Sequence, residues 1–142
     1  MSISVKLDLD EDGVEVNQTM YRGIIRSLLY LTASKPNIIF SVRMHARFQA
    51  APKESHLKAA KRILRYLKET QDLVLSYPTC DSLDLIGLAN ADYAGFLVDR
   101  KSTSGMSRFL GSSLISWGIK KQNSVALSTA EAEYVVVASC CA

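Results

Sequence analysis

The stretch from Ser104 to Ile119, S-G-M-S-R-F-L-G-S-S-L-I-S-W-G-I, predicts two β-strands joined by a tight turn. Apolar residues lie on both sides of a glycine and two serines at 111–113, a pattern typical of a β-hairpin. Trp117 lies in the second strand-like run, where we expect it to anchor a core rather than to stack on a base. The hairpin therefore defines the β part of the fold.

The residues around the hairpin extend this pattern in both directions. Upstream, residues 83–89 predict a further strand, and residues 73–77 predict a short one. Downstream, Ser128 and Glu131 have the spacing of a capping box, so we expect Glu131 to cap a helix over 132–139 rather than to bind a metal. The second half is therefore expected to form a three-stranded antiparallel meander followed by one helix.

The first half of the chain has a helical rhythm interrupted by Pro36 and Pro52. The clearest helix spans residues 53–68, where apolar residues recur at helical spacing. Its predicted apolar stripe consists of Leu57, Ala60, Leu64 and Leu67. Its other surface carries five basic residues, which are Lys58, Lys61, Arg62, Arg65 and Lys68. Together the two halves predict the α+β class.

Positive charge concentrates in the helical half. Residues 1–19 carry five acidic residues against one lysine, whereas residues 20–70 carry eleven basic residues against two acidic ones. A basic amphipathic helix can offer its free face to phosphates, although it can equally be a solvated surface. We divide the sequence into a polar lead-in (1–19), a helical region with the basic helix (20–70) and a strand-rich region (71–142).

Composition excludes several classes of protein. The 142 residues are 48% hydrophobic and 22% charged, which is ordinary for one globular domain. No apolar run reaches the ~18 residues that a membrane span needs, so no membrane partner is expected. The three cysteines lack metal-binding spacing, and the acidic N-terminus lacks the apolar segment of a secretory signal. These features favour an intracellular setting, in the cytoplasm or nucleus.

Several motifs, in order, resemble the Pol polyproteins of copia-type retrotransposons. Residues 56–68, H-L-K-A-A-K-R-I-L-R-Y-L-K, resemble that family's basic helix, and residues 27–33, S-L-L-Y-L-T-A, resemble the segment before it. Residues 99–105, D-R-K-S-T-S-G, and residues 126–134, A-L-S-T-A-E-A-E-Y, resemble the opening of its RNase H domain. The resemblance implies a reverse transcriptase connection region followed by an incomplete RNase H-like domain.

The resemblance also implies a metal site, from which this sequence departs. In the intact family, carboxylates hold two Mg²⁺ ions that cleave a phosphodiester. Asn90 occupies the position of the first metal-binding Asp, and a neutral amide cannot supply the missing charge. Glu133 matches the family's catalytic Glu on the helix, and Asp92 shares a strand face with Asn90 and is a weak second ligand candidate. We therefore expect no bound cofactor and no nuclease activity.

Three hypotheses for function follow from these residues. The first is a non-catalytic retroelement fragment whose basic helix binds an RNA or DNA duplex weakly and without sequence preference. The second is RNase H activity completed by another chain. The third is an interaction protein or secreted effector, because Arg62 to Arg65 spell the R-x-L-R tetrapeptide of oomycete effectors.

An open strand edge is a further expectation. The strand over residues 83–89 would have a neighbour on one side alone, because the strands that follow in the family lie beyond residue 142. Unpaired edges favour association with other chains. We therefore expect self-association through this strand and marginal stability.

Overall fold

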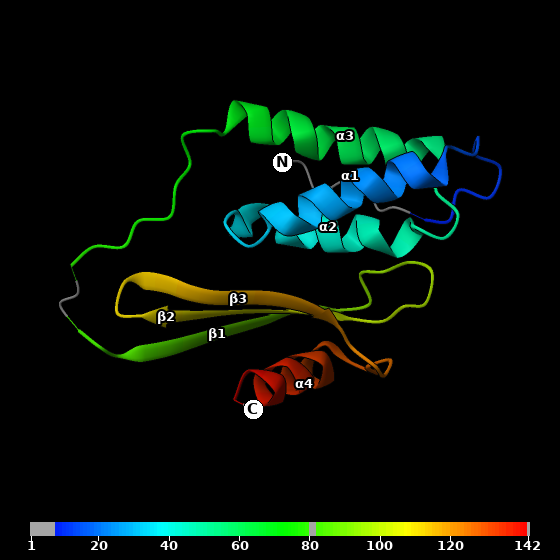
Figure 1. The fold of residues 1–142 in the computed structure, drawn as a ribbon. Coiled ribbons are helices and arrows are strands. Elements are labelled where there is room, and N and C mark those ends of the chain that lie inside the picture. Colours follow the sequence, from blue (N-terminus) through cyan, green and yellow to red (C-terminus); the bar gives the residue numbers. More distant parts are fainter. Residues whose placement is uncertain (1–7, 80–81, 142) are drawn as a thin grey trace. The chain divides into compact units, whose positions relative to one another are not determined.

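A computed structural model describes residues 8–79 and 82–141. The chain divides into two compact units, which we call the helical unit (up to Val74) and the sheet unit (from Leu75). Helices make up the first unit, and a three-stranded sheet with one helix makes up the second (Figure 1). The predicted α+β class is confirmed.

The helical unit consists of α1 (Gln18–Leu31), η1 (Pro36–Ile38), α2 (Ile39–His45), η2 (Ala46–Phe48) and α3 (Glu54–Glu69). Asn17 caps α1, because its side chain accepts a hydrogen bond from the Met20 N–H at 2.9 Å. Pro36 begins η1, as its fixed φ favours. The core side chains are at most 1% exposed and are Tyr21, Ile25, Leu28, Ile38, Val42, Ala60 and Ile63.

The buried face of α3 differs from the predicted stripe. Leu57 and Ala60 are buried as expected, but Ile63 is completely buried and Leu64 is 42% exposed. Ile63 packs with Leu28, Ile38 and Val42, so the buried face of the helix is centred closer to Ile63 than to Leu64, while Leu57 and Ala60 keep their predicted places. The sequence pattern allowed either choice, and the apolar side chains of α1 and α2 select Ile63.

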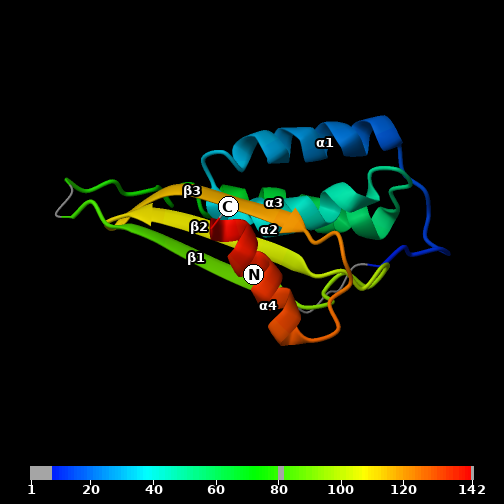
Figure 2. The same ribbon diagram turned by 90° about the horizontal axis from the view of Figure 1, so that it is seen from below.

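The sheet unit contains β1 (Leu85–Asp92), β2 (Thr103–Leu110) and β3 (Ser113–Lys121), all antiparallel in the order β1-β2-β3. The hairpin between β2 and β3 is confirmed, and Gly111 adopts a φ of 56° in its two-residue loop. Helix α4 (Thr129–Cys141) packs mainly against β1 on one face of the sheet (Figure 2). The predicted meander followed by one helix is therefore present.

Two sequence expectations fail or hold only in part. Residues 73–77 form no strand. The backbone there has no partner strand to complete its hydrogen bonds, and Val74 is 82% exposed. Trp117 pairs with Ser107 across the sheet and is half-buried rather than enclosed in a core.

Polar contacts hold α4 to the sheet. The predicted capping box is present in part: Ser128 Oγ accepts from the Glu131 N–H (3.1 Å), but Glu131 Oε2 accepts from the N–H of Leu127 (2.7 Å), one residue before Ser128. The buried Gln122 side chain donates to Ser104 Oγ (3.0 Å) and to the Ala132 carbonyl (2.9 Å). One amide therefore joins β2 to the first turn of α4.

Candidate functional site

The sequence predicts an exposed basic surface on α3, which we call the basic face of α3. The basic face consists of five side chains, all of them exposed: Lys58, Lys61, Arg62, Arg65 and Lys68. Their spacing repeats every three or four residues, so they lie along one side of the helix. The opposite side is buried in the helical unit, which leaves the basic side free to meet a ligand.

Most of the charge on the basic face is uncompensated. Lys58 forms an ion pair with Glu54 at 3.0 Å, one turn earlier on the helix. Within residues 8–79 and 82–141, the other four basic side chains form no ion pair with a carboxylate. The C-terminal two-thirds of the face therefore present four cations to solvent.

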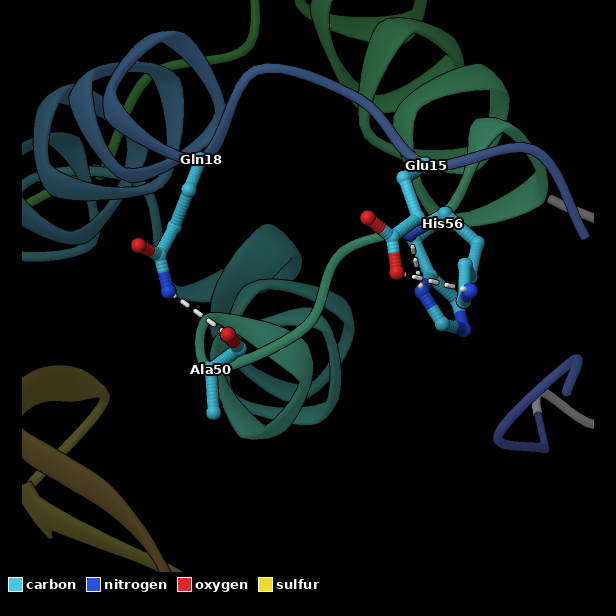
Figure 3. Close-up of polar contacts among 5 residues, drawn as sticks. Glu15, Gln18, Ala50 and His56 are labelled. Carbon is cyan, nitrogen blue, oxygen red and sulfur yellow. Dashed lines mark hydrogen bonds and ion pairs between the residues drawn. The ribbon is translucent and has the colours of Figure 1, made fainter.

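The described part of the polar lead-in, residues 8–19, is folded against the start of α3, which the sequence did not indicate. The Val16 N–H donates to the Pro52 carbonyl (3.2 Å), and the Glu54 N–H donates to the Val14 carbonyl (2.9 Å). Figure 3 shows the side chain of Gln18 reaching the Ala50 carbonyl, at 2.6 Å. Residues 14–18 therefore fix the position at which α3 begins.

The buried side chain of His56 links the start of α3 to the lead-in. Its Nδ1 accepts from the Lys53 N–H (3.0 Å), so its Nε2 carries the proton and donates to the Asp8 carbonyl (2.8 Å). The ring is 1% exposed and stacks on Phe48, with centroids 4.1 Å apart. His56 is therefore a packing and capping residue, and it offers no surface to a phosphate.

A second buried histidine was not singled out from the sequence. Burial lowers the pKa of His45, and this outweighs the opposing effect of the bond from Nδ1 to the Ser41 carbonyl. Tyr21 donates its hydroxyl to the His45 carbonyl (2.9 Å), and burial raises the pKa of the Tyr21 phenol. Both groups are buried, neutral parts of the helical unit.

Glu133 lies beside the end of β1. Its Oε1 accepts from the Ala91 N–H at 3.1 Å, so the carboxylate lies next to the peptide that joins Asn90 to Ala91. A Cβ at Gly87 would lie 3.2 Å from Cys140 Sγ of α4, so Gly87 lies on the face of β1 that α4 covers. Side chains alternate along a strand, so Ala89 and Ala91 lie on the same covered face and Asn90 lies on the opposite face.

Asp92 also lies on the face turned away from α4, together with Asn90. Its carboxylate packs against Gly95 in the turn after β1, where a Cβ on Gly95 would meet Asp92 Oδ2 at 1.9 Å. The structure therefore brings Glu133 to β1 but does not turn Asp92 towards it. The pairing of these two carboxylates around one ion stays a prediction.

The donor set does not fit two divalent ions. Such a site needs several anionic oxygens converging on one point. Here one carboxylate is bonded to a backbone N–H, one lies in a turn on the other face, and Asn90 is neutral. Within the described ranges, no three histidine, cysteine, aspartate or glutamate side chains converge, and no helix is long and apolar enough to cross a membrane.

Comparison with known proteins identifies relatives among retrotransposon polyproteins. The chain is 41% identical over 139 residues to the retrovirus-related Pol polyprotein from transposon RE1 of Arabidopsis thaliana. That alignment covers 98% of this chain and 10% of the polyprotein. No known family profile matches the chain, and no solved structure does either.

Two shorter relatives are covered over most of their own length. The secreted RxLR effector protein 161 of Plasmopara viticola is 36% identical over 118 residues, which is 82% of this chain and 83% of that protein. An uncharacterized mitochondrial protein of Arabidopsis thaliana is 31% identical over 108 residues, which is 70% of this chain and 97% of that protein. The chain belongs to the family of proteins related to copia-type retrotransposon Pol polyproteins.

Proposed function

We propose that this chain binds nucleic acid through the basic face of α3, without sequence preference and without catalysis. The observation that carries the proposal is the set of five exposed cations on one side of a helix whose other side is buried. Lysine and arginine side chains neutralise phosphates and release counterions, so such binding weakens steeply with salt. The duplex is recognised by its backbone, and the bases are not read.

We further propose that the helical unit corresponds to a polymerase connection region and the sheet unit to the opening of an RNase H-like domain. The succession of a basic helix, an antiparallel meander and a helix carrying Glu133 supports this assignment. The chain spans about 10% of the Pol polyproteins, so their activities are not carried over with the assignment. The neutral Asn90 and the position of Asp92 support a chain without nuclease chemistry.

The binding test is a salt series with the whole chain. Fluorescence anisotropy of a labelled duplex, repeated between low and physiological salt, gives the slope of log K against log salt. If all five cations contact phosphates, that slope is about −4.5 on duplex DNA. Two unrelated sequences of equal length are expected to give the same affinity.

A matched pair of variants separates the basic face from net charge. Lys61→Ala/Arg65→Ala removes two cations from the face, and the slope is expected to fall by about 2 units. Arg26→Ala/Lys120→Ala removes two exposed cations from outside the basic face, so the two double variants have the same net charge. Equal losses for the two variants, or binding that does not depend on salt, would contradict the proposal.

The catalytic part is tested on an RNA–DNA hybrid with Mg²⁺. At high protein concentration we expect no cleavage by the chain alone. Cleavage that Glu133→Gln abolishes would instead establish RNase H activity, with a second copy of the chain supplying the remaining carboxylates. Cleavage that survives Glu133→Gln is attributable to a contaminating nuclease, and a preparation free of it decides the question.

A second candidate function, an interaction protein of the effector type, is favoured by the relative from Plasmopara viticola. The position of the R-x-L-R tetrapeptide argues against this candidate. Arg62 to Arg65 lie within α3, and Ile63 in their middle is completely buried, so the motif is not an accessible extended segment. Detection of the full chain in the medium of cells that express it would favour this candidate, and strict retention would exclude it.

A further inference from the structure

We propose that the open edge of β1 pairs with β1 of a second copy of this chain. The two strands are antiparallel, and their two-fold axis passes between the two copies of Gly87. This inference is independent of nucleic-acid binding. It starts from the order β1-β2-β3, which leaves one long edge of β1 without a strand partner among residues 8–79 and 82–141.

The hydrogen bond of Glu133 fixes which backbone groups lie on that edge. The Ala91 N–H donates to Glu133 and is therefore turned away from β2. The Asp84 carbonyl accepts from the Gly111 N–H and is turned towards β2. The backbone N–H and C=O groups of successive residues point to opposite edges of a strand. Those of Leu85, Gly87 and Ala89 therefore point to the open edge.

These three residues determine the register of the pair. The Ala91 N–H is already occupied, so the available groups run from Leu85 to Ala89 and their midpoint is Gly87. An antiparallel copy that uses all of them places Leu85 opposite Ala89 and Gly87 opposite itself. A two-fold axis of this kind closes the edge in both copies at once and stops at a dimer.

The side chains on the face away from α4 are complementary in this register. Ile86 and Leu88 are 49% and 54% exposed, and each would lie opposite the other across the axis. Directly opposed apolar side chains are a main source of sheet stability. Asp84 would lie opposite Asn90, whose neutral amide can donate to that carboxylate, so no like charges face each other.

The experiment is sedimentation velocity of the full chain from low to high micromolar concentration. The unmodified chain is expected to show a reversible monomer–dimer equilibrium. A chain that stays monomeric throughout, or that forms open-ended species beyond the dimer, would overturn the proposal. Far-UV circular dichroism on each variant establishes that the strands and helices are retained.

Charge placement tests the register. Ile86→Lys/Leu88→Lys puts two like-charged pairs directly across the axis, and we expect the dimer to weaken by about tenfold or more. Ile86→Lys/Leu88→Glu changes the same positions but puts opposite charges across the axis, and we expect dimerisation to be retained. Equal behaviour of the two variants would overturn the register.

Two further variants serve as controls. Ile115→Lys/Val125→Lys adds the same charge at sites that are 48% and 49% exposed and lie off β1, and it is expected to leave the dimer intact. Its dissociation would attribute association to net charge or to β3 and would contradict the proposal. Asn90→Asp, which places a carboxylate opposite Asp84, is expected to weaken the dimer severalfold, and a stronger dimer would count against the register.

Discussion

The helices of the helical unit enclose an apolar core, whereas the sheet unit leaves much of one strand open. Ile25, Leu28 and Ile63 are completely buried between three helices, but Leu85 and Leu88 on β1 are 67% and 54% exposed. Both units have strongly apolar sequences, so composition does not account for the difference. A helix needs one partner for one apolar stripe, whereas a strand also needs a neighbour for its backbone.

This contrast gives the two units different surfaces. The helical unit presents exposed cations on a face whose geometry its own core fixes. The sheet unit presents the backbone groups and exposed apolar side chains of β1, on which the proposed pairing depends. Measurements of stability separate the enclosed core of the helical unit from the contacts that hold the sheet unit together.

The largest loss of stability is expected from a cavity in the core of the helical unit. Ile63→Ala removes a completely buried side chain, and we expect the free energy of unfolding to fall by about 2–5 kcal/mol. Leu64→Ala, at the adjacent and half-exposed position, is the control and should cost less than about 1 kcal/mol. Urea denaturation followed by circular dichroism measures both, and a larger loss in Leu64→Ala than in Ile63→Ala would mean that α3 buries the stripe that the sequence pattern predicted.

The sheet unit is tested at its buried amide. Gln122→Leu leaves Ser104 Oγ and the Ala132 carbonyl without the donor they share, at a cost of about 1–3 kcal/mol. Asn123→Leu changes the neighbouring amide, which is exposed, and should be almost neutral. Hydrogen exchange at β2 and α4 locates the effect, and a loss confined to the helical unit would contradict it.

A smaller effect is expected at the start of α4. Glu131→Ala removes the acceptor of the Leu127 N–H and should lower stability by about 1 kcal/mol. Glu131→Gln keeps an oxygen in place and should retain most of that stability. Thermal unfolding of the two variants compares them, and an equal loss in both would show that charge, and not the hydrogen bond, is what matters there.

The last prediction concerns the pH dependence of the helical unit. Burial lowers the pKa of His45 below its ordinary value of 6.5, so the unfolded chain binds a proton more readily than the folded one. Stability is therefore highest above about pH 6.5 and falls as the pH is lowered through and below that value. Urea midpoints measured across this range should fall less steeply in His45→Gln, and an unchanged slope would exclude His45 as the cause.

Regular periodicity made much of the fold predictable. The hairpin, the capping box at Ser128 and the basic side of α3 all follow from local spacing, which is unaffected by distant residues. The choice between Ile63 and Leu64 did not follow, because both fit a helical stripe and packing against α1 and α2 decides between them. The strand expected at residues 73–77 failed because a strand is defined by its partner.

The candidate sites were predictable only as residue types. The five cations could be assigned to one side of α3 from their spacing, and all are exposed. The contact between His56 and Asp8 joins residues 48 positions apart, and no local pattern indicates it. The separation of Asp92 from Glu133 was also hidden, since it depends on which face of β1 the helix α4 covers.

The glycine after β1 has an effect that reaches beyond its own position. The carboxylate of Asp92 occupies the space where a side chain at 95 would begin, and a Cβ there would meet Asp92 Oδ2 at 1.9 Å. Even an alanine at this position would have to push that short, exposed acid into a new rotamer. Mutational drift at one small residue can thus re-aim a carboxylate while leaving its identity untouched.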